Sequence, residues 1–209
     1  MADNVLSAKS KKTHILVECA VMIALATVLS FIKVYEAPFG GSVTLLSMAP
    51  IIVLSMRHGI KVGLSGAFVY SILQLILGIN NVAWVPTAGG IILCILFDYL
   101  IPFTLLGLGG IFRNISFTKN KMLNLIIASV LGTLLVTLLR FFCHVVSGAV
   151  IWYALDLEWY ADDPTHIVHQ YGAWMFSLIY NGTFMIPEII ETMIGVPLLT
   201  SALVKFKIK

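Results

Sequence analysis

The chain has 209 residues, of which 59% are hydrophobic and only 11% are charged, and its formal net charge is +3. Its mean hydropathy of +0.99 lies far above that of a soluble globular domain. The composition therefore excludes a water-soluble domain and indicates an integral membrane protein.

Apolar runs long enough to cross a hydrocarbon core of about 30 Å recur along the sequence. Residues 1–14 are polar and basic, and we expect a cytoplasmic tail there rather than a signal peptide. A membrane domain over residues 15–204 follows, in which we expect six transmembrane helices: Ile15–Ile32, Val43–Met56, Ile60–Ile79, Gly90–Phe112, Met122–Trp152 and Trp174–Val204. The second is short for a span, which predicts a tilted, broken or partly interfacial helix. Residues 153–173 are expected to form an acidic extracellular loop, and residues 205–209 a basic cytoplasmic tail.

The basic residues predict the orientation of these spans. With the N-terminus inside, eleven of the thirteen Lys and Arg residues fall on the cytoplasmic side. These eleven are Lys9, Lys11, Lys12, Arg57, Lys61, Arg113, Lys119, Lys121, Lys205, Lys207 and Lys209. The sequence thus predicts an all-α, multi-pass protein of the bacterial plasma membrane with both termini in the cytoplasm.

Four polar side chains interrupt the later apolar runs. An ionisable group inside the membrane has a high free-energy cost, so its presence indicates a functional role. Asp98 lies ~12 Å below the outer end of the fourth span, at 1.5 Å per residue. Arg140 and His144, four residues apart on one helix face, lie ~27 and ~33 Å above the inner end of the fifth. Asn181 lies ~10 Å below the outer end of the sixth. We therefore expect these groups to meet in the outer half of the membrane.

Aromatic side chains surround the same level. The rings are Trp84, Tyr99, Trp152, Trp174, Phe176 and Tyr180. Some of them are explained by the interfacial belt found in any membrane protein. Together with a carboxylate, an imidazole and an amide, they would suit a small, flat, nitrogen-rich cation.

Two other interpretations remain open at this point. Asp98 and Arg140 could form a purely structural ion pair. Alternatively, Asp98, Glu188 and Glu191 could form a proton path in a stand-alone, ion-coupled small-molecule carrier. The sequence contains no phosphate loop, zinc-protease motif or nucleophile elbow, so we predict no enzyme activity. No cofactor, bound metal or nucleic-acid partner is expected either.

A series of short motifs extends, in order, through about residues 15–200. The motifs are Gly40–Ile51, Arg57-His58-Gly59, Phe97-Asp98-Tyr99, Leu106–Phe112, Arg140–His144 with Ser147-Gly148 and Trp152, Tyr180-Asn181-Gly182 and Pro187-Glu188. Taken together, this series resembles the thiamine-specific S components of energy-coupling factor (ECF) transporters. The best-known members of that family carry Glu where this chain has Asp98.

The resemblance implies a six-helix bundle that captures thiamine, or a related heterocyclic vitamin, from outside. It implies a lipid-embedded complex with a transmembrane coupling subunit and two cytoplasmic ATPases. The implied substrate-binding residues are Asp98, Tyr99, His144, Trp152 and Asn181, with Phe39, Trp84 or Tyr180 supplying a further ring. In this scheme Asp98 and Asn181 hydrogen-bond an aminopyrimidine, while Trp152 and His144 flank a thiazolium.

Small residues in the first span form a separate feature. Ala20 and Ala24 lie four residues apart, so they share one helix face and let another helix approach closely in lipid. Ordinary packing within the bundle would explain them equally well. The resemblance implies that this face docks the coupling subunit.

Overall fold

The computed structural model describes residues 2–38 and 40–207, with side chains for residues 10–38 and 40–203. Phe39, one of the rings considered above, lies outside the described residues. The helices are α1 (Ala2–Ser30), α2 (Ala49–His58), α3 (Ile60–Leu77), α4 (Ile79–Val82), α5 (Ala88–Cys94), α6 (Ile101–Leu105), α7 (Lys121–Ser147), α8 (Tyr153–Trp159), α9 (Ile167–Gln170) and α10 (Ala173–Lys207). Two π-helical turns, η1 (Ile95–Leu100) and η3 (Gly148–Trp152), a 3₁₀ turn, η2 (Leu106–Leu108), and two strands, β1 (Lys33–Glu36) and β2 (Ser42–Thr44), complete the described structure.

Five helical segments among the described residues are long and apolar enough to cross a membrane. They are Ser10–Ser30, Ile60–Leu77, Ala88–Leu108, Lys121–Trp159 and Ala173–Leu203. The predicted second span corresponds to α2, which has only 10 residues and is buried along most of its length. The structure thus accounts for five of the six predicted spans by length and apolar character, and the count of six stays a prediction.

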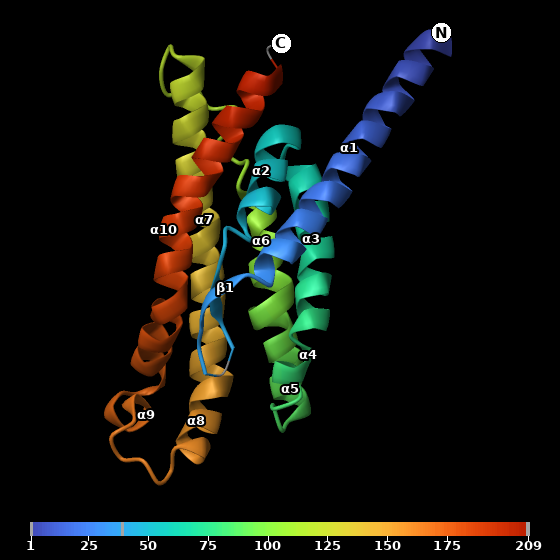
Figure 1. The fold of residues 1–209 in the computed structure, drawn as a ribbon. Helices are drawn as coiled ribbons and strands as arrows, with labels where there is room; N and C mark the ends of the chain where they lie inside the picture. The colour runs from blue at the N-terminus through green and yellow to red at the C-terminus, as the bar shows by residue number, and fades with distance from the viewer. Residues whose placement is uncertain (1, 39, 208–209) are drawn as a thin grey trace.

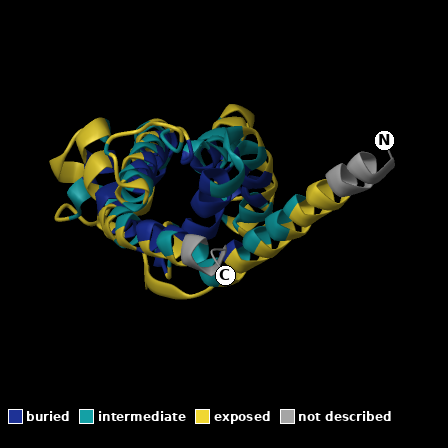
Figure 2. Cartoon of the chain, turned by 90° about the horizontal axis from the view of Figure 1, so that it is seen from above, coloured by how far each residue is buried: buried dark blue, intermediate teal, exposed yellow. Residues whose placement is uncertain are grey.

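The helices run roughly side by side, with the N-terminal end of α1 and the C-terminal end of α10 at the same end of the bundle (Figure 1). Seen from above, α1 projects away from the other helices and is coloured mostly exposed or intermediate (Figure 2). Glu18 fastens α1 to the end of α2: it accepts a hydrogen bond from Arg57 Nε and lies 2.9 Å from His58 Nε2. This contact anchors a helix that otherwise buries little of its surface.

A short β-hairpin precedes α2, where the sequence predicted the start of a span. Its strands are antiparallel and pair Tyr35 with Val43. The backbone N–H of Thr44 donates to Glu188 Oε1 at 2.5 Å, and the Thr44 hydroxyl donates to the same oxygen at 2.7 Å. Leu46 N–H donates to Glu191 Oε1 at 3.0 Å. Two of the three carboxylates considered for a proton path, Glu188 and Glu191, therefore tie the hairpin region to α10.

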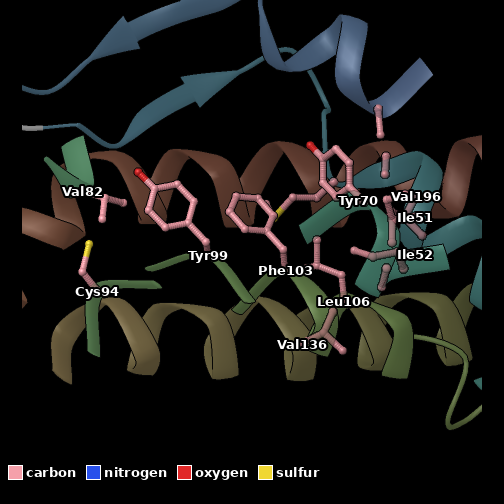
Figure 3. Packing of buried hydrophobic residues seen from close by; sticks show 14 of the residues in the cluster. Ile51, Ile52, Tyr70, Val82, Cys94, Tyr99, Phe103, Leu106, Val136 and Val196 are labelled. Carbon is pink, nitrogen blue, oxygen red and sulfur yellow. The ribbon is translucent and has the colours of Figure 1, made fainter. Parts of the chain in front are cut away.

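The core that supports the cavity lies between α3, α6 and α7. Tyr99, Phe103 and Leu106 follow one another along the fourth predicted span, with Tyr70 and Val136 on either side (Figure 3). The rings of Tyr70 and Phe103 meet edge to face, with centroids 5.5 Å apart. The helix periodicity predicts this arrangement, because residues three or four apart share a face.

The segment expected to be an acidic loop is partly helical. From Lys121 the chain stays helical through α7, η3 and α8 as far as Trp159, and α9 forms one more turn within the connection to α10. The residues after Trp152 contain no helix breaker before Pro164, so the helix continues past the predicted boundary. Asp156 accordingly lies on a helix rather than in a loop.

Candidate functional site

A cavity of about 330 Å³ opens between the hairpin and the helices. Residues from the hairpin, α3, α4, η1, α6, α7, η3, α8 and α10 line it. The volume lies at the lower end of the range for small-molecule sites. Many of its lining residues are polar, which is unusual for the interior of a membrane bundle and indicates a binding site.

Both π-helical turns of the described chain carry residues of this cavity. Asp98 and Tyr99 lie on η1, and Trp152 lies on η3. Pro102 follows η1 and has no backbone N–H, so the regular bond to the carbonyl of Asp98 cannot form there. Widened turns of this kind are rare and frequently occur at functional sites because they redirect side chains.

Asp98 is the centre of the hydrogen-bond network on the cavity wall. Its Oδ2 accepts from the Ser147 hydroxyl at 2.6 Å and from Trp152 Nε1 at 2.9 Å. Its Oδ1 lies 3.4 Å from His144 Nδ1. All three partners come from α7 and η3, so the carboxylate bridges the fourth and fifth predicted spans.

The next contact in this network determines the tautomer of His144. Arg140 Nε donates to His144 Nε2 at 3.2 Å, and an arginine Nε always carries a proton. His144 Nε2 must therefore accept, which leaves the ring proton on Nδ1, facing Asp98. The chain Arg140–His144–Asp98 is thus a directed series of donors ending on the carboxylate. Among the described side chains, Asp98 and Arg140 form no direct ion pair. The purely structural Asp98–Arg140 ion pair that the sequence left open is therefore absent from the described structure.

Asn181 approaches the same wall from α10. Its amide nitrogen donates to the backbone oxygens of His144 and Ser177 at 3.2 and 2.9 Å. These bonds direct the side-chain oxygen elsewhere, so it remains available to accept from a ligand. Close packing holds the two elements together: a Cβ on Gly148 would lie 2.1 Å from the Ser177 hydroxyl and 2.8 Å from Asn181 Nδ2.

Arg140 and Glu188 form a further polar group in the cavity lining. The Arg140 guanidinium lies over the Phe103 ring, 4.3 Å from its centroid, in a cation–π contact. Within the part of the chain that the structure describes, Arg140 Nη1 and Glu188 Oε2 are buried without a hydrogen-bond partner. This part of the cavity therefore offers both a donor and an acceptor to a bound molecule or water.

The structure brings most of the sequence-predicted binding residues to this one cavity. Those that line it are Asp98, Tyr99, His144, Trp152, Tyr180 and Asn181. Trp84 is not among the lining residues; its ring packs edge to face against Trp159 at 6.0 Å. The side chain of Tyr180 donates to the Gly40 carbonyl at 3.1 Å, next to the hairpin.

Ser147, which the sequence places only in a motif, and Phe184 are among the residues of the site that are not predicted as binding residues. Ser147 lies three residues after His144 and so shares its helix face, a signal that could have found it. Phe184 lines the cavity and its ring approaches His144 edge to face at 6.0 Å. It also contacts Gly41: a Cβ there would lie 2.4 Å from the Phe184 ring, and Gly41 has φ of +85°.

Comparison with known proteins identifies the family. Residues 16–208 match the family described as "Thiamine transporter protein (Thia_YuaJ)". The chain belongs to this thiamine transporter family. It is therefore a transport protein rather than an enzyme, and its apolar helices make it a multi-pass protein of the plasma membrane.

Individual members show the extent of the similarity. The chain is 33% identical to the thiamine transporter ThiT of Bacillus subtilis over 190 residues, which cover 87% of this chain and 88% of that protein. It is 30% identical to the thiamine transporter ThiT of Lacticaseibacillus paracasei over 183 residues, 82% and 79% of the two chains. The solved structure of ThiT from Listeria monocytogenes superposes with a TM-score of 0.71 at 23% identity and covers 93% of this chain and 97% of that one. This last likeness establishes the fold.

Proposed function

We propose that this chain is the substrate-binding S component of an ECF-type importer and that it captures thiamine from outside the cell. The observation that carries the proposal is the Asp98 carboxylate, held by neutral donors in a 330 Å³ cavity of a thiamine transporter family member. Thiamine joins an aminopyrimidine to a cationic thiazolium. A carboxylate with aromatic neighbours suits both an exocyclic amine and a ring cation.

The contacts support a division of roles within the cavity. Asp98 would accept a hydrogen bond from the amine of the pyrimidine, and the Asn181 side-chain oxygen would accept a second one. Trp152 and His144 would lie along the rings, with Tyr99 and Tyr180 closing the sides. Each of these residues lines the cavity, and the donors that surround Asp98 hold its oxygens in place before a ligand arrives.

The binding part of the proposal is tested by titrating purified protein with thiamine and following tryptophan fluorescence. Trp152 donates to Asp98, so a ligand that engages this carboxylate should change the emission of the tryptophan. Saturable quenching at one thiamine per chain is the expected result. A folded, monodisperse protein that shows neither quenching nor heat of binding with thiamine would overturn the assignment.

The transport part of the proposal includes the partners that the resemblance implies, a coupling subunit and two ATPases, and the sequence itself contains no phosphate loop. Vesicles that contain this chain alone should bind thiamine without accumulating it. Accumulation that depends only on an ion gradient would instead support the stand-alone carrier. The anchoring of Glu188 and Glu191 to the hairpin region argues against such a proton path.

We assign the docking of the coupling subunit to α1. Ala20 and Ala24 are exposed on this helix, beside the exposed apolar side chains of Val17, Val21 and Leu25. Small residues among large apolar ones let a second helix pack closely in lipid. Ala20→Trp should block uptake by the full complex and leave thiamine binding unchanged, whereas Leu138→Trp on the exposed face of α7 should affect neither. Equal uptake by the two variants would exclude α1 as the docking surface.

A further inference from the structure

Asp156 is a buried carboxylate of the cavity lining, as Glu188 is. It lies on α8, only 1% of its surface is exposed, and it is among the lining residues. Within the described chain, its Oδ1 is buried and has no hydrogen-bond partner. Burying a carboxylate oxygen without a hydrogen-bond partner costs folding free energy unless a ligand, ion or water supplies that partner.

The position of Asp156 relates it to the proposed ligand contacts. It follows Trp152 by four residues along a continuous helical segment, about one turn or ~6 Å farther toward the α9 end of the bundle. Trp152 itself donates to Asp98. Trp152 therefore relates two of the lining carboxylates: it hydrogen-bonds Asp98 and lies one helical turn from Asp156.

Among the described residues, neither Asp98 nor Asp156 has a Lys or Arg side chain as an ion-pair partner. Lys33 and Glu36 pair with each other at 2.6 Å near the surface. Arg140 donates to His144 and lies over the Phe103 ring, so among the described side chains it forms no ion pair with Asp98 or Asp156. Asp98 is bound by a serine, a tryptophan and a histidine whose tautomer makes it neutral, and no described Lys or Arg forms an ion pair with Asp156.

We infer that Asp156 is a specificity-determining binding residue, which supplies the counter-charge for a cationic ring while Asp98 takes the amine end of the same molecule. The inference rests on the proposed function and narrows the substrate class to permanently cationic heterocycles. A ligand with one amine and one fixed positive charge meets both carboxylates, whereas a neutral ligand of the same shape leaves Asp156 unpaired.

The test compares thiamine with a neutral isostere in which a thiophene ring replaces the thiazolium. Both ligands are titrated calorimetrically into purified full-length wild type, Asp156→Asn and Glu158→Gln. Glu158 is the matched control, an exposed carboxylate on the same helix. Asp156→Asn should weaken thiamine binding roughly 10- to 100-fold, as expected for losing one opposite charge at a few ångströms in a partly dry site, and leave the neutral isostere within about threefold. Glu158→Gln should change neither.

Two further variants separate charge from folding. Asp156→Glu keeps the charge and should keep the preference for thiamine over the isostere, and Asp156→Ser replaces the Asn variant if that variant does not purify as folded protein. Unchanged thiamine affinity in the neutral variants, or an equal loss for both ligands, would overturn the role of Asp156. Wild-type protein that binds no thiamine would instead refute the proposed function, and this inference with it.

Discussion

Replacing Asp98 by Asn removes one charge and converts one acceptor oxygen into a donor. In the wild-type chain, Asp98 Oδ2 accepts hydrogen bonds from Ser147 and Trp152, and Oδ1 faces His144 Nδ1. An asparagine that keeps its oxygen toward Ser147 and Trp152 presents its NH₂ group to the Nδ1 proton of His144. The histidine can avoid this clash only by moving its proton to Nε2, where Arg140 already donates. The substitution therefore disturbs the whole series of donors.

The expected loss of affinity follows from the charge and the hydrogen bond. A carboxylate and a ring cation about 6 Å apart interact by about 3 kcal/mol at an effective dielectric constant near 20. Only 15% of the Asp98 side chain is exposed, so water screens this interaction little. Replacing the charged acceptor of the amine by a neutral one lowers the binding free energy by roughly 1 kcal/mol more. Water that solvates the free site offsets part of the charge interaction and part of the hydrogen bond. We expect a loss of about 2–4 kcal/mol, or roughly 30- to 1000-fold in Kd.

Calorimetric titration with thiamine is the appropriate assay, because Asp98→Asn alters the surroundings of Trp152 and so changes the fluorescence signal itself. Glu191→Gln is the matched control: its carboxylate lies within α10, accepts from Leu46 N–H and does not line the cavity. This control should bind thiamine within about threefold of wild type. Equal losses in the two variants, or no loss in Asp98→Asn, would refute the placement of the ligand against Asp98.

Two further predictions concern the supports of the cavity. Glu188→Ala leaves the Thr44 N–H without its acceptor and leaves the Thr44 hydroxyl only Ser47 Oγ. It should lower the free energy of unfolding by about 2–4 kcal/mol, seen as a lower melting temperature in detergent, with a smaller shift for Glu191→Ala, which loses one contact. Equal shifts would contradict the anchoring role. Gly148→Ala places a methyl group 2.1 Å from a hydroxyl oxygen of α10 and should weaken thiamine binding at least tenfold, whereas Gly182→Ala, whose nearest side-chain atom would lie at 3.6 Å, should be tolerated in the same titration. Full thiamine affinity in Gly148→Ala would contradict the close packing of η3 against α10.

The depth of the polar residues could be predicted because helix geometry is nearly constant. Counting residues from the ends of the predicted spans places Asp98, His144 and Asn181 in the outer half of the bundle, and the structure brings them to one cavity. The same counting gave the shared face of Arg140 and His144, which form a hydrogen bond. Local periodicity and a fixed rise per residue are sufficient for such predictions.

Features that depend on distant contacts could not be predicted in this way. The strand at Ser42–Thr44 is held by Glu188, 144 residues farther along the chain, and the apolar pattern around it resembles the start of a helix. The π-helical turn at Asp98 depends on Pro102 and on packing against α7. The acidic residues and Pro164 after Trp152 indicate a loop, yet α8 continues the helix and turns the Asp156 side chain toward the cavity.

The most direct test of the account is a crystal structure of the chain bound to thiamine. The account predicts the aminopyrimidine within hydrogen-bonding distance of Asp98 and Asn181, with the rings against Trp152 and His144. Thiamine bound elsewhere on the protein, or turned so that neither ring approaches Asp98, would contradict it.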